Sequence, residues 1–231
     1  MIERLLIFDL DGTLLDAHGA GHAAMEAAFR EVYGVSGHFD RIDFAGRTDP
    51  AVLEAAAQAA GLACPPETRQ RLEAAMVSAL ERVVRTTPVT AMPGAHDLLA
   101  GMLAEGRTAL AVGTGNVEAG AWIKLKAAGL AHFFPVGGFG SDAVDRASML
   151  AAALRRAQAH YALAAVPAAA LGDTPRDVEA AHANHIGVVG VATGQYSIAQ
   201  LEAAGADAVV ADLTDADAVE KAVARALAHG S

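Results

Sequence analysis

The 231-residue chain has little of several residue types that define common protein classes. Its one cysteine, Cys64, cannot form a disulfide within the chain, which excludes a disulfide-stapled secreted scaffold and favours a reducing compartment. Aromatic residues make up only 5% of the chain and charged residues only 19%. Hydrophobic residues make up 53%, which is enough for a large buried core and excludes disorder as the main state.

Runs of basic residues and long apolar runs are also lacking. The formal net charge is -10 and no Lys/Arg run occurs, which argues against nucleic acid or an anionic membrane as a partner. No stretch approaches the ~18 uncharged apolar residues of a membrane span. The apolar N-terminus is interrupted by Glu3, Asp9 and Asp11, unlike a signal peptide. We therefore expect a soluble, cytoplasmic protein with neither partner, whereas the oligomeric state cannot be read from the sequence.

Short apolar runs recur along most of the chain. They cover residues 5–8, 108–112, 168–171, 187–191 and 208–210, and residues 133–138 are a candidate edge strand. The runs are uniformly apolar rather than alternating, which is typical of parallel strands covered on both faces. Helix-length segments such as 119–128 and 147–160 lie between them. This order predicts an α/β fold with a doubly wound, mainly parallel, Rossmann-like sheet.

One interval, from residue 16 to about residue 90, has no comparable strand run. It contains helical stretches at 21–33, 50–60 and 66–85 instead. We therefore predict a core formed by residues 1–15 and 91–231, into which residues 16–90 are inserted as a separate helical domain.

Polar residues follow three of the apolar runs directly. Asp9 and Asp11 follow the first run, and Asp173 and Asp177 follow the third. Ligands of open α/β sheets bind at the carboxyl ends of the strands, so these four carboxylates should converge on one crevice. Their mutual repulsion calls for a cation, and ligation by oxygen alone suits Mg²⁺.

The same strand ends carry groups suited to phosphate chemistry. The hydroxyls of Thr13 and Thr114, together with N–H groups in the glycine-containing turns, can hold phosphate oxygens. A carboxylate can attack phosphorus and form an aspartyl-phosphate. A metal and a cationic side chain would offset the charge that builds up on the phosphoryl group.

The segment Asp9-Leu10-Asp11-Gly12-Thr13, the strand-end Thr114 and the pair Asp173 and Asp177 resemble the motifs of the haloacid dehalogenase-like hydrolase superfamily. The chain is most similar to the branch of phosphoglycolate phosphatase and β-phosphoglucomutase, and the helical insert resembles that superfamily's α-helical cap. The resemblance implies a Mg²⁺-dependent phosphatase that hydrolyses a small phosphorylated metabolite through an aspartyl-phosphate.

The resemblance also implies a role for each matching residue. Asp9 would be the nucleophile and a metal ligand, and Asp11 would be the general acid/base, whose backbone carbonyl also binds the metal. Thr114 and Asn116 would hold the phosphoryl group. Asp173 would bind Mg²⁺ directly, and Asp177 would support the metal from behind.

The chain departs from the branch at one position. Relatives carry a catalytic lysine in a Lys-Pro motif, but the corresponding residues 140–148 here contain no lysine. Lys124 and Arg146 are the two candidates for a cation beside Asp9. We favour Lys124, because lysines are scarce in this chain and this one lies on the helix after Thr114. Lys126 should face elsewhere on that helix.

Residues 46–49 of the insert, Gly-Arg-Thr-Asp, precede a predicted helix that starts at Pro50. They either cap that helix or contact the substrate from the insert. Arg47, Thr48 and Arg146 are therefore candidate substrate contacts.

Three other functions remain open at this point. A phosphosugar mutase would use the same nucleophile and return the phosphoryl group to a sugar. A 2-haloacid dehalogenase needs no metal, and Asp11 as acid/base argues against it. A non-catalytic binding protein on this scaffold is supported only by the missing Lys-Pro motif.

Overall fold

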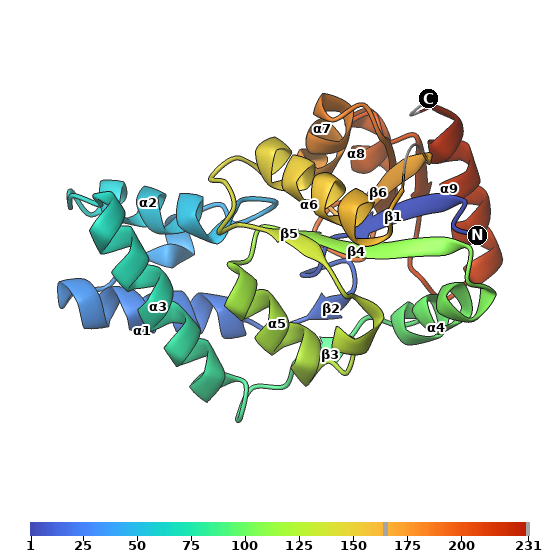
Figure 1. Ribbon diagram of the computed structural model, residues 1–231. Coiled ribbons are helices and arrows are strands. Elements are labelled where there is room, and N and C mark those ends of the chain that lie inside the picture. The colour runs from blue at the N-terminus through green and yellow to red at the C-terminus, as the bar shows by residue number, and fades with distance from the viewer. Residues whose placement is uncertain (164–165, 230–231) are drawn as a thin grey trace.

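The computed structural model describes residues 1–163 and 166–229 of the chain. In Figure 1, a group of helices (α1 to α3) lies on one side and a sheet covered by further helices lies on the other. The N-terminus lies at the end of the sheet away from the helical group, so β1 runs toward that group. No helix of the described residues is long and apolar enough to cross a membrane.

The sheet has six parallel strands in the order β5-β4-β1-β6-β7-β8. The strands are β1 (Arg4–Phe8), β4 (Thr108–Thr114), β5 (Gly137–Phe139), β6 (Ala168–Gly172), β7 (Gly187–Val191) and β8 (Ala208–Val210). This confirms the predicted parallel α/β sheet, in which strands that follow one another in the chain are joined by crossovers.

The edge strand β5 begins later than the sequence indicates. Residues 133–138 are predicted to be extended, but Ala131–Phe133 forms a 3-10 turn and the strand covers Gly137–Phe139. Phe133 and Phe134 are instead buried as core side chains. Gly138 lets helix α6 approach the strand, since a Cβ there would lie 2.5 Å from the backbone nitrogen of Ala153.

Helices cover both faces of the sheet. They are α4 (Ala95–Glu105), α5 (Glu118–Ala127), α6 (Arg146–His160), α7 (Pro175–Ala183), α8 (Ile198–Ala203) and α9 (Ala216–His229). Along β1, Leu6 and Phe8 pack with α4, α5 and α9, whereas Leu5 and Ile7 pack with α6 and α7. Because successive side chains of a strand point to opposite faces, the uniformly apolar sequence of β1 fits a strand buried on both.

The helical insert contains α1 (Ala20–Tyr33), α2 (Asp49–Ala59) and α3 (Pro66–Val83), with α1 and α3 packed along each other. Two short strands, β2 (Leu15–Asp16) and β3 (Thr90–Ala91), form an antiparallel pair where the chain leaves the sheet region and returns to it. The division into a core of 1–15 and 91–231 and a cap of 16–90 agrees with this pairing and stays a proposal. Residues 164–165 and 230–231 of that core range lie outside the described residues.

Candidate active site

Three buried carboxylates meet at the carboxyl ends of β1 and β6. Asp9 follows β1, Asp173 follows β6 and Asp177 lies in the first turn of α7, and their exposed fractions are 7%, 5% and 6%. Each offers an oxygen atom, and these atoms lie within 4.8 Å of one another. Burial raises the pKa of Asp9 to about 7, and Asp177 adds to the shift. Burial and the charge of Asp9 raise the pKa of Asp173 to about 8. The cluster is therefore costly to ionise unless cations are present.

One such cation is Arg146, the first residue of α6. Its Nη2 lies 2.7 Å from Oδ1 of Asp9, and Nη2 also contacts Oδ1 of Asp177. Nε of Arg146 donates to the same Asp177 oxygen at 2.8 Å. Burial alone would lower the pKa of Arg146, but the charges of Asp177 and Asp9 outweigh it and raise the pKa, so the side chain stays cationic. The guanidinium thus bridges two carboxylates, a geometry that suits its planar donors.

The preference for Lys124 as the cation beside Asp9 is therefore corrected. Lys124 lies on α5 and places Nζ 2.8 Å and 2.7 Å from the two carboxylate oxygens of Asp11, not of Asp9. Arg146, the first residue of α6 after the N-cap Asp145, is the cation that contacts Asp9. Lys126, two residues beyond Lys124, is exposed, as expected.

Asp11 is held by a second donor as well. Nδ2 of Asn116 donates to Oδ2 of Asp11 at 2.6 Å and to Oγ1 of Thr114 at 2.9 Å. The Asp11 side chain is 39% exposed, whereas that of Lys124 is only 6% exposed. Asp11 is therefore more accessible than Asp9, Asp173 and Asp177, and its carboxylate is held from α5 and from the end of β4.

The three buried carboxylates fit a hard divalent cation. Arg146 balances one of their three charges, and the three atoms that the cluster offers are carboxylate oxygens, the type that Mg²⁺ prefers. Within residues 1–163 and 166–229, Oδ2 of Asp9 and Oδ2 of Asp173 accept no hydrogen bond. Gly12, whose φ is +87°, and Gly194 leave room for Asp173, since a Cβ on either would collide with that carboxylate. Asp9 and Asp173 thus have oxygens available for the metal.

Asp177 is engaged differently from the other two carboxylates. Its Oδ1 accepts from Arg146, and its Oδ2 accepts from the backbone N–H of Thr174 at 3.0 Å and from the Thr174 hydroxyl at 2.7 Å. Thr174 in turn caps α7, so the two residues form a reciprocal capping box. Asp177 therefore both caps α7 and binds Arg146. A role for Asp177 in metal binding stays a prediction.

The two threonines predicted to hold phosphate lie in different environments. Thr13 is fully buried, and its hydroxyl donates to Oδ1 of Asp173 at 3.2 Å. Among the described residues, it is not part of the cavity lining. Thr114 and Asn116 do line the cavity. Thr13 thus positions Asp173 from behind, and phosphate binding by Thr114 and Asn116 stays a prediction.

Residues 46–49 of the insert both cap a helix and reach the cavity, whereas contact with a substrate stays a prediction. Thr48 is the N-cap of α2, is 1% exposed and donates to the carbonyl of Val144 at 2.6 Å, which confirms the capping interpretation for this residue. Arg47 lines the cavity. Its guanidinium makes no hydrogen bond or ion pair in the part of the chain that the structure describes.

Asp49 is a cavity residue that was absent from the predicted site. Its backbone N–H donates to the carbonyl of Gly115 at 2.7 Å, and its Oδ2 accepts from the N–H of Val117 at 2.8 Å. Burial raises its pKa to about 6, although Lys124 opposes the shift. Asp49 thus ties the insert to the loop after β4. The Gly-Arg-Thr-Asp sequence could have indicated this residue, but an aspartate at that position is equally typical of the first turn of a helix.

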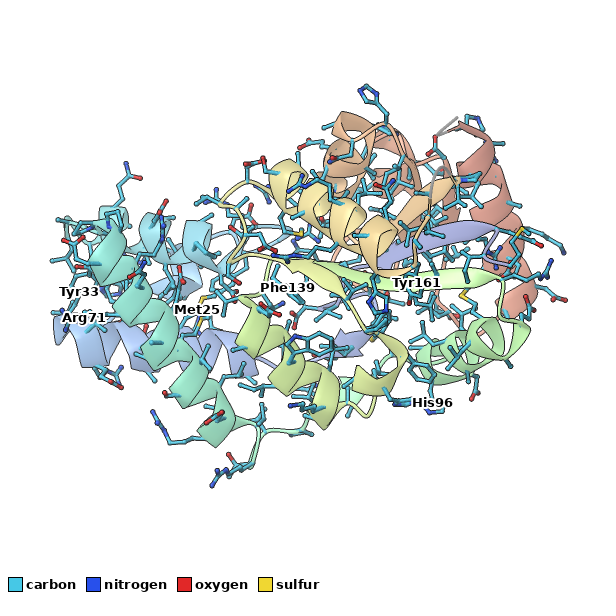
Figure 2. All side chains as sticks on the ribbon, viewed as in Figure 1. Met25, Tyr33, Arg71, His96, Phe139 and Tyr161 are labelled. Carbon is cyan, nitrogen blue, oxygen red and sulfur yellow. The ribbon has the colours of Figure 1, made fainter. Side chains whose placement is uncertain are left out.

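Core and insert together enclose a cavity of about 690 Å³. Its floor contains Asp9, Asp11, Asp173 and Arg146, and the insert contributes His22, Met25, Phe44, Arg47 and Asp49. Figure 2 shows Met25 on the part of the insert nearer the sheet, whereas Tyr33 and Arg71 lie at the far end. A volume of this size holds a small organic molecule rather than a phosphate ion alone.

A parallel α/β sheet with a helical insert, and a carboxylate-rich pocket at its strand ends, define a class of hydrolases. The sequence model of the haloacid dehalogenase-like hydrolases matches residues 6–182. The chain belongs to this family.

Individual relatives agree with this assignment. The chain is 32% identical over 213 residues to the "Probable phosphatase IndB" of Dickeya dadantii (strain 3937), covering 90% of each sequence. Its fold resembles that of a hydrolase from Pseudomonas syringae, with a TM-score of 0.70, 26% identity and coverage of 95% and 98% of the two chains. It also resembles CbbY from Rhodobacter sphaeroides in complex with phosphate, with a TM-score of 0.70, 21% identity and coverage of 93% and 96%. At that identity the last likeness shows the fold alone.

Proposed function

We propose that the protein is a Mg²⁺-dependent phosphatase that hydrolyses a small phosphorylated metabolite through an aspartyl-phosphate on Asp9. The observation that supports this most is the buried carboxylate of Asp9, which lies at a strand end between Asp173 and a bridging arginine. The relative named "Probable phosphatase IndB" supports the same reaction class.

In the first half of the reaction, a carboxylate oxygen of Asp9 attacks phosphorus and the bond from phosphorus to the leaving oxygen breaks. Asp11, on the accessible side of the cavity, donates a proton to that leaving oxygen. Asp9 and Asp173 would hold Mg²⁺, which when bound would neutralise charge on the phosphoryl oxygens. Thr114, Asn116 and Arg146 orient the same group from the strand ends.

In the second half, Asp11 takes a proton from water, and the water oxygen attacks the acyl phosphate. The acyl-phosphate bond breaks, inorganic phosphate leaves and the carboxylate of Asp9 is regenerated. A mutase would share the first half, but in its second half the phosphoryl group would pass from Asp9 to a sugar hydroxyl instead of to water.

Removal of the metal should abolish phosphate release. We expect activity to disappear after exhaustive chelation and to return with Mg²⁺, because Arg146 balances only one of the three carboxylate charges. The measurement is phosphate release over a panel of phosphate monoesters, with isomer formation monitored on sugar phosphates. Mg²⁺ should also raise the unfolding temperature of the wild type but not of Asp173→Asn. Full activity in chelator would remove the metal from the proposal, and isomer formation without phosphate release would favour the mutase.

Loss of Lys124 should impair turnover through Asp11. In Lys124→Met, both contacts to the Asp11 carboxylate are lost while Asn116 keeps one, so we expect kcat to fall by roughly 10- to 100-fold with a smaller change in KM. Lys126→Met is a matched control, since Lys126 is an exposed lysine of the same helix. Equal effects of the two substitutions would show that Lys124 has no special role.

A further inference from the structure

The insert contributes a wall of aromatic rings to the cavity. His22 and Phe44 both line the cavity, and their ring centroids lie 5.6 Å apart with an interplanar angle of 32°. Phe39, which is 1% exposed, backs both rings at 6.1 Å. We call His22 and Phe44, backed by Phe39, the ring wall.

The ring wall is unusual in a chain with so few aromatic residues. Phe29 and Tyr33 extend it into the insert through ring contacts at 5.6 Å and 4.7 Å. The inner rings, Phe29 and Phe39, are buried and serve the packing of the insert. His22 is exposed and Phe44 is only partly buried, and both border the cavity, so packing alone does not account for them.

The position of the ring wall relates it to the reacting groups. His22 follows Gly21, where an added Cβ would lie 3.4 Å from Nζ of Lys124. Lys124 in turn contacts Asp11, the proposed acid for the leaving group. The start of α1, with His22, therefore lies near Asp11 on the leaving-group side of the cavity. Phe44 extends the ring wall toward Gly46, whose carbonyl accepts from Nη1 of Arg146 at 3.4 Å.

Two further features favour a flat, polar-edged ring over a plain apolar group. Within the described residues, the imidazole nitrogens of His22 make no hydrogen bond, so they are available to polar atoms at the edge of a bound ring. The planar guanidinium of Arg47 also lines the cavity. Against the effect of burial, its charge helps to lower the pKa of Asp43, but within the described residues the guanidinium makes no hydrogen bond or ion pair, so it can stack on a ring or bind hydroxyls.

We propose that the substrate is a phosphate monoester whose leaving group carries a heteroaromatic ring, specifically a nucleoside monophosphate, with the ring packed on His22 and Phe44. This rests on the proposed function, because the phosphate end is assigned by the proposed roles of Asp9 and Asp11. Every nucleobase can stack on an aromatic side chain, so we propose nucleoside monophosphates as a class and not one particular base.

Binding and turnover test the two proposals separately. Binding is measured by calorimetry with the Asp9→Asn protein and Mg²⁺, using the common 5′-ribonucleotides, ribose 5-phosphate and hexyl phosphate. We expect at least one nucleotide to bind about tenfold or more tightly than either comparison compound. Equal binding of ribose 5-phosphate, tighter binding of hexyl phosphate, or no nucleotide binding would each overturn the inference. Phosphate release by the wild type is measured independently, and its absence from every monoester would overturn the proposed function instead.

A substitution locates the preference on the ring wall. Phe44→Leu keeps an apolar side chain but removes the ring, and should lower kcat/KM for the preferred nucleotide about tenfold while leaving ribose 5-phosphate within twofold. Tyr33→Leu is the matched control, since it removes a ring from the far end of the insert (Figure 2). An equal loss for both substrates in Phe44→Leu, or the same loss of preference in Tyr33→Leu, would mean that the rings serve only the fold.

Discussion

Asp9→Asn should reduce phosphate release by roughly four orders of magnitude or more while the protein stays folded. The amide has nearly the volume of the carboxylate but cannot act as an anionic nucleophile. In the wild type, beryllium fluoride should be retained with Mg²⁺ as a mimic of the acyl phosphate, and this retention should be lost in the variant. Turnover near the wild-type rate would remove Asp9 from the nucleophile's role.

The effect of Asp9→Asn on the stability of the fold, which is the control for this variant, can be predicted in direction. Burial raises the pKa of Asp9 from its ordinary value of 3.8 to about 7, so the folded state binds this proton more tightly than the unfolded state. The stability associated with the proton is present at low pH and is lost as the pH rises from about 4 to about 7. In chelator, Asp9→Asn should therefore unfold at a temperature no lower than the wild type, with a difference that grows from pH 5 to pH 8. If the variant were less stable than the wild type at pH 8, nearby cations would stabilise the ionised Asp9 carboxylate more than its burial destabilises it.

The sheet and the carboxylates could be predicted because each depends on local sequence. The apolar run of β1 and Asp9 directly after it are neighbours in the chain, and the parallel topology then brings Asp173 from β6 to the same edge. The edge strand β5 was placed too early, because Phe133 and Phe134 have the apolar character of a strand but are buried as core side chains between elements. Hydrophobicity alone does not distinguish these two situations.

The partners of the carboxylates could not be predicted in the same way. Lys124 and Arg146 are both cations on helices that start near the strand ends, and sequence distance does not say which aspartate each reaches. That outcome depends on where α5 and α6 begin and on the length of each side chain. The ring wall depends even more on tertiary contacts, because His22 and Phe44 lie on separate elements of the insert and meet only through its packing.

Arg146→Met should reduce kcat by about 100- to 1,000-fold, more than Lys124→Met. Arg146 contacts the proposed nucleophile itself, and its side chain is 9% exposed, so water cannot replace the lost charge effectively. Without the guanidinium, Asp9 and Asp177 would face each other with no shared cation, and the phosphoryl group would lose a nearby positive charge. This reverses the order expected from the sequence, in which Lys124 was favoured.

Two comparison variants separate catalysis from folding in this experiment. Arg156→Met makes the same change on the same helix, at an arginine that pairs with Asp142 and has a side chain 44% exposed, so it should alter kcat less than twofold. Arg146→Lys retains the charge but not the planar fork, and should recover part of the activity, since a positive charge beside Asp9 is restored. If Arg146→Met is folded and loses less than tenfold in kcat, while Lys124→Met loses far more, the catalytic cation acts through Asp11 and the bridge between Asp9 and Asp177 is structural. If both variants are nearly silent, Mg²⁺ and the N-terminus of α7 must balance the phosphoryl charge without either side chain.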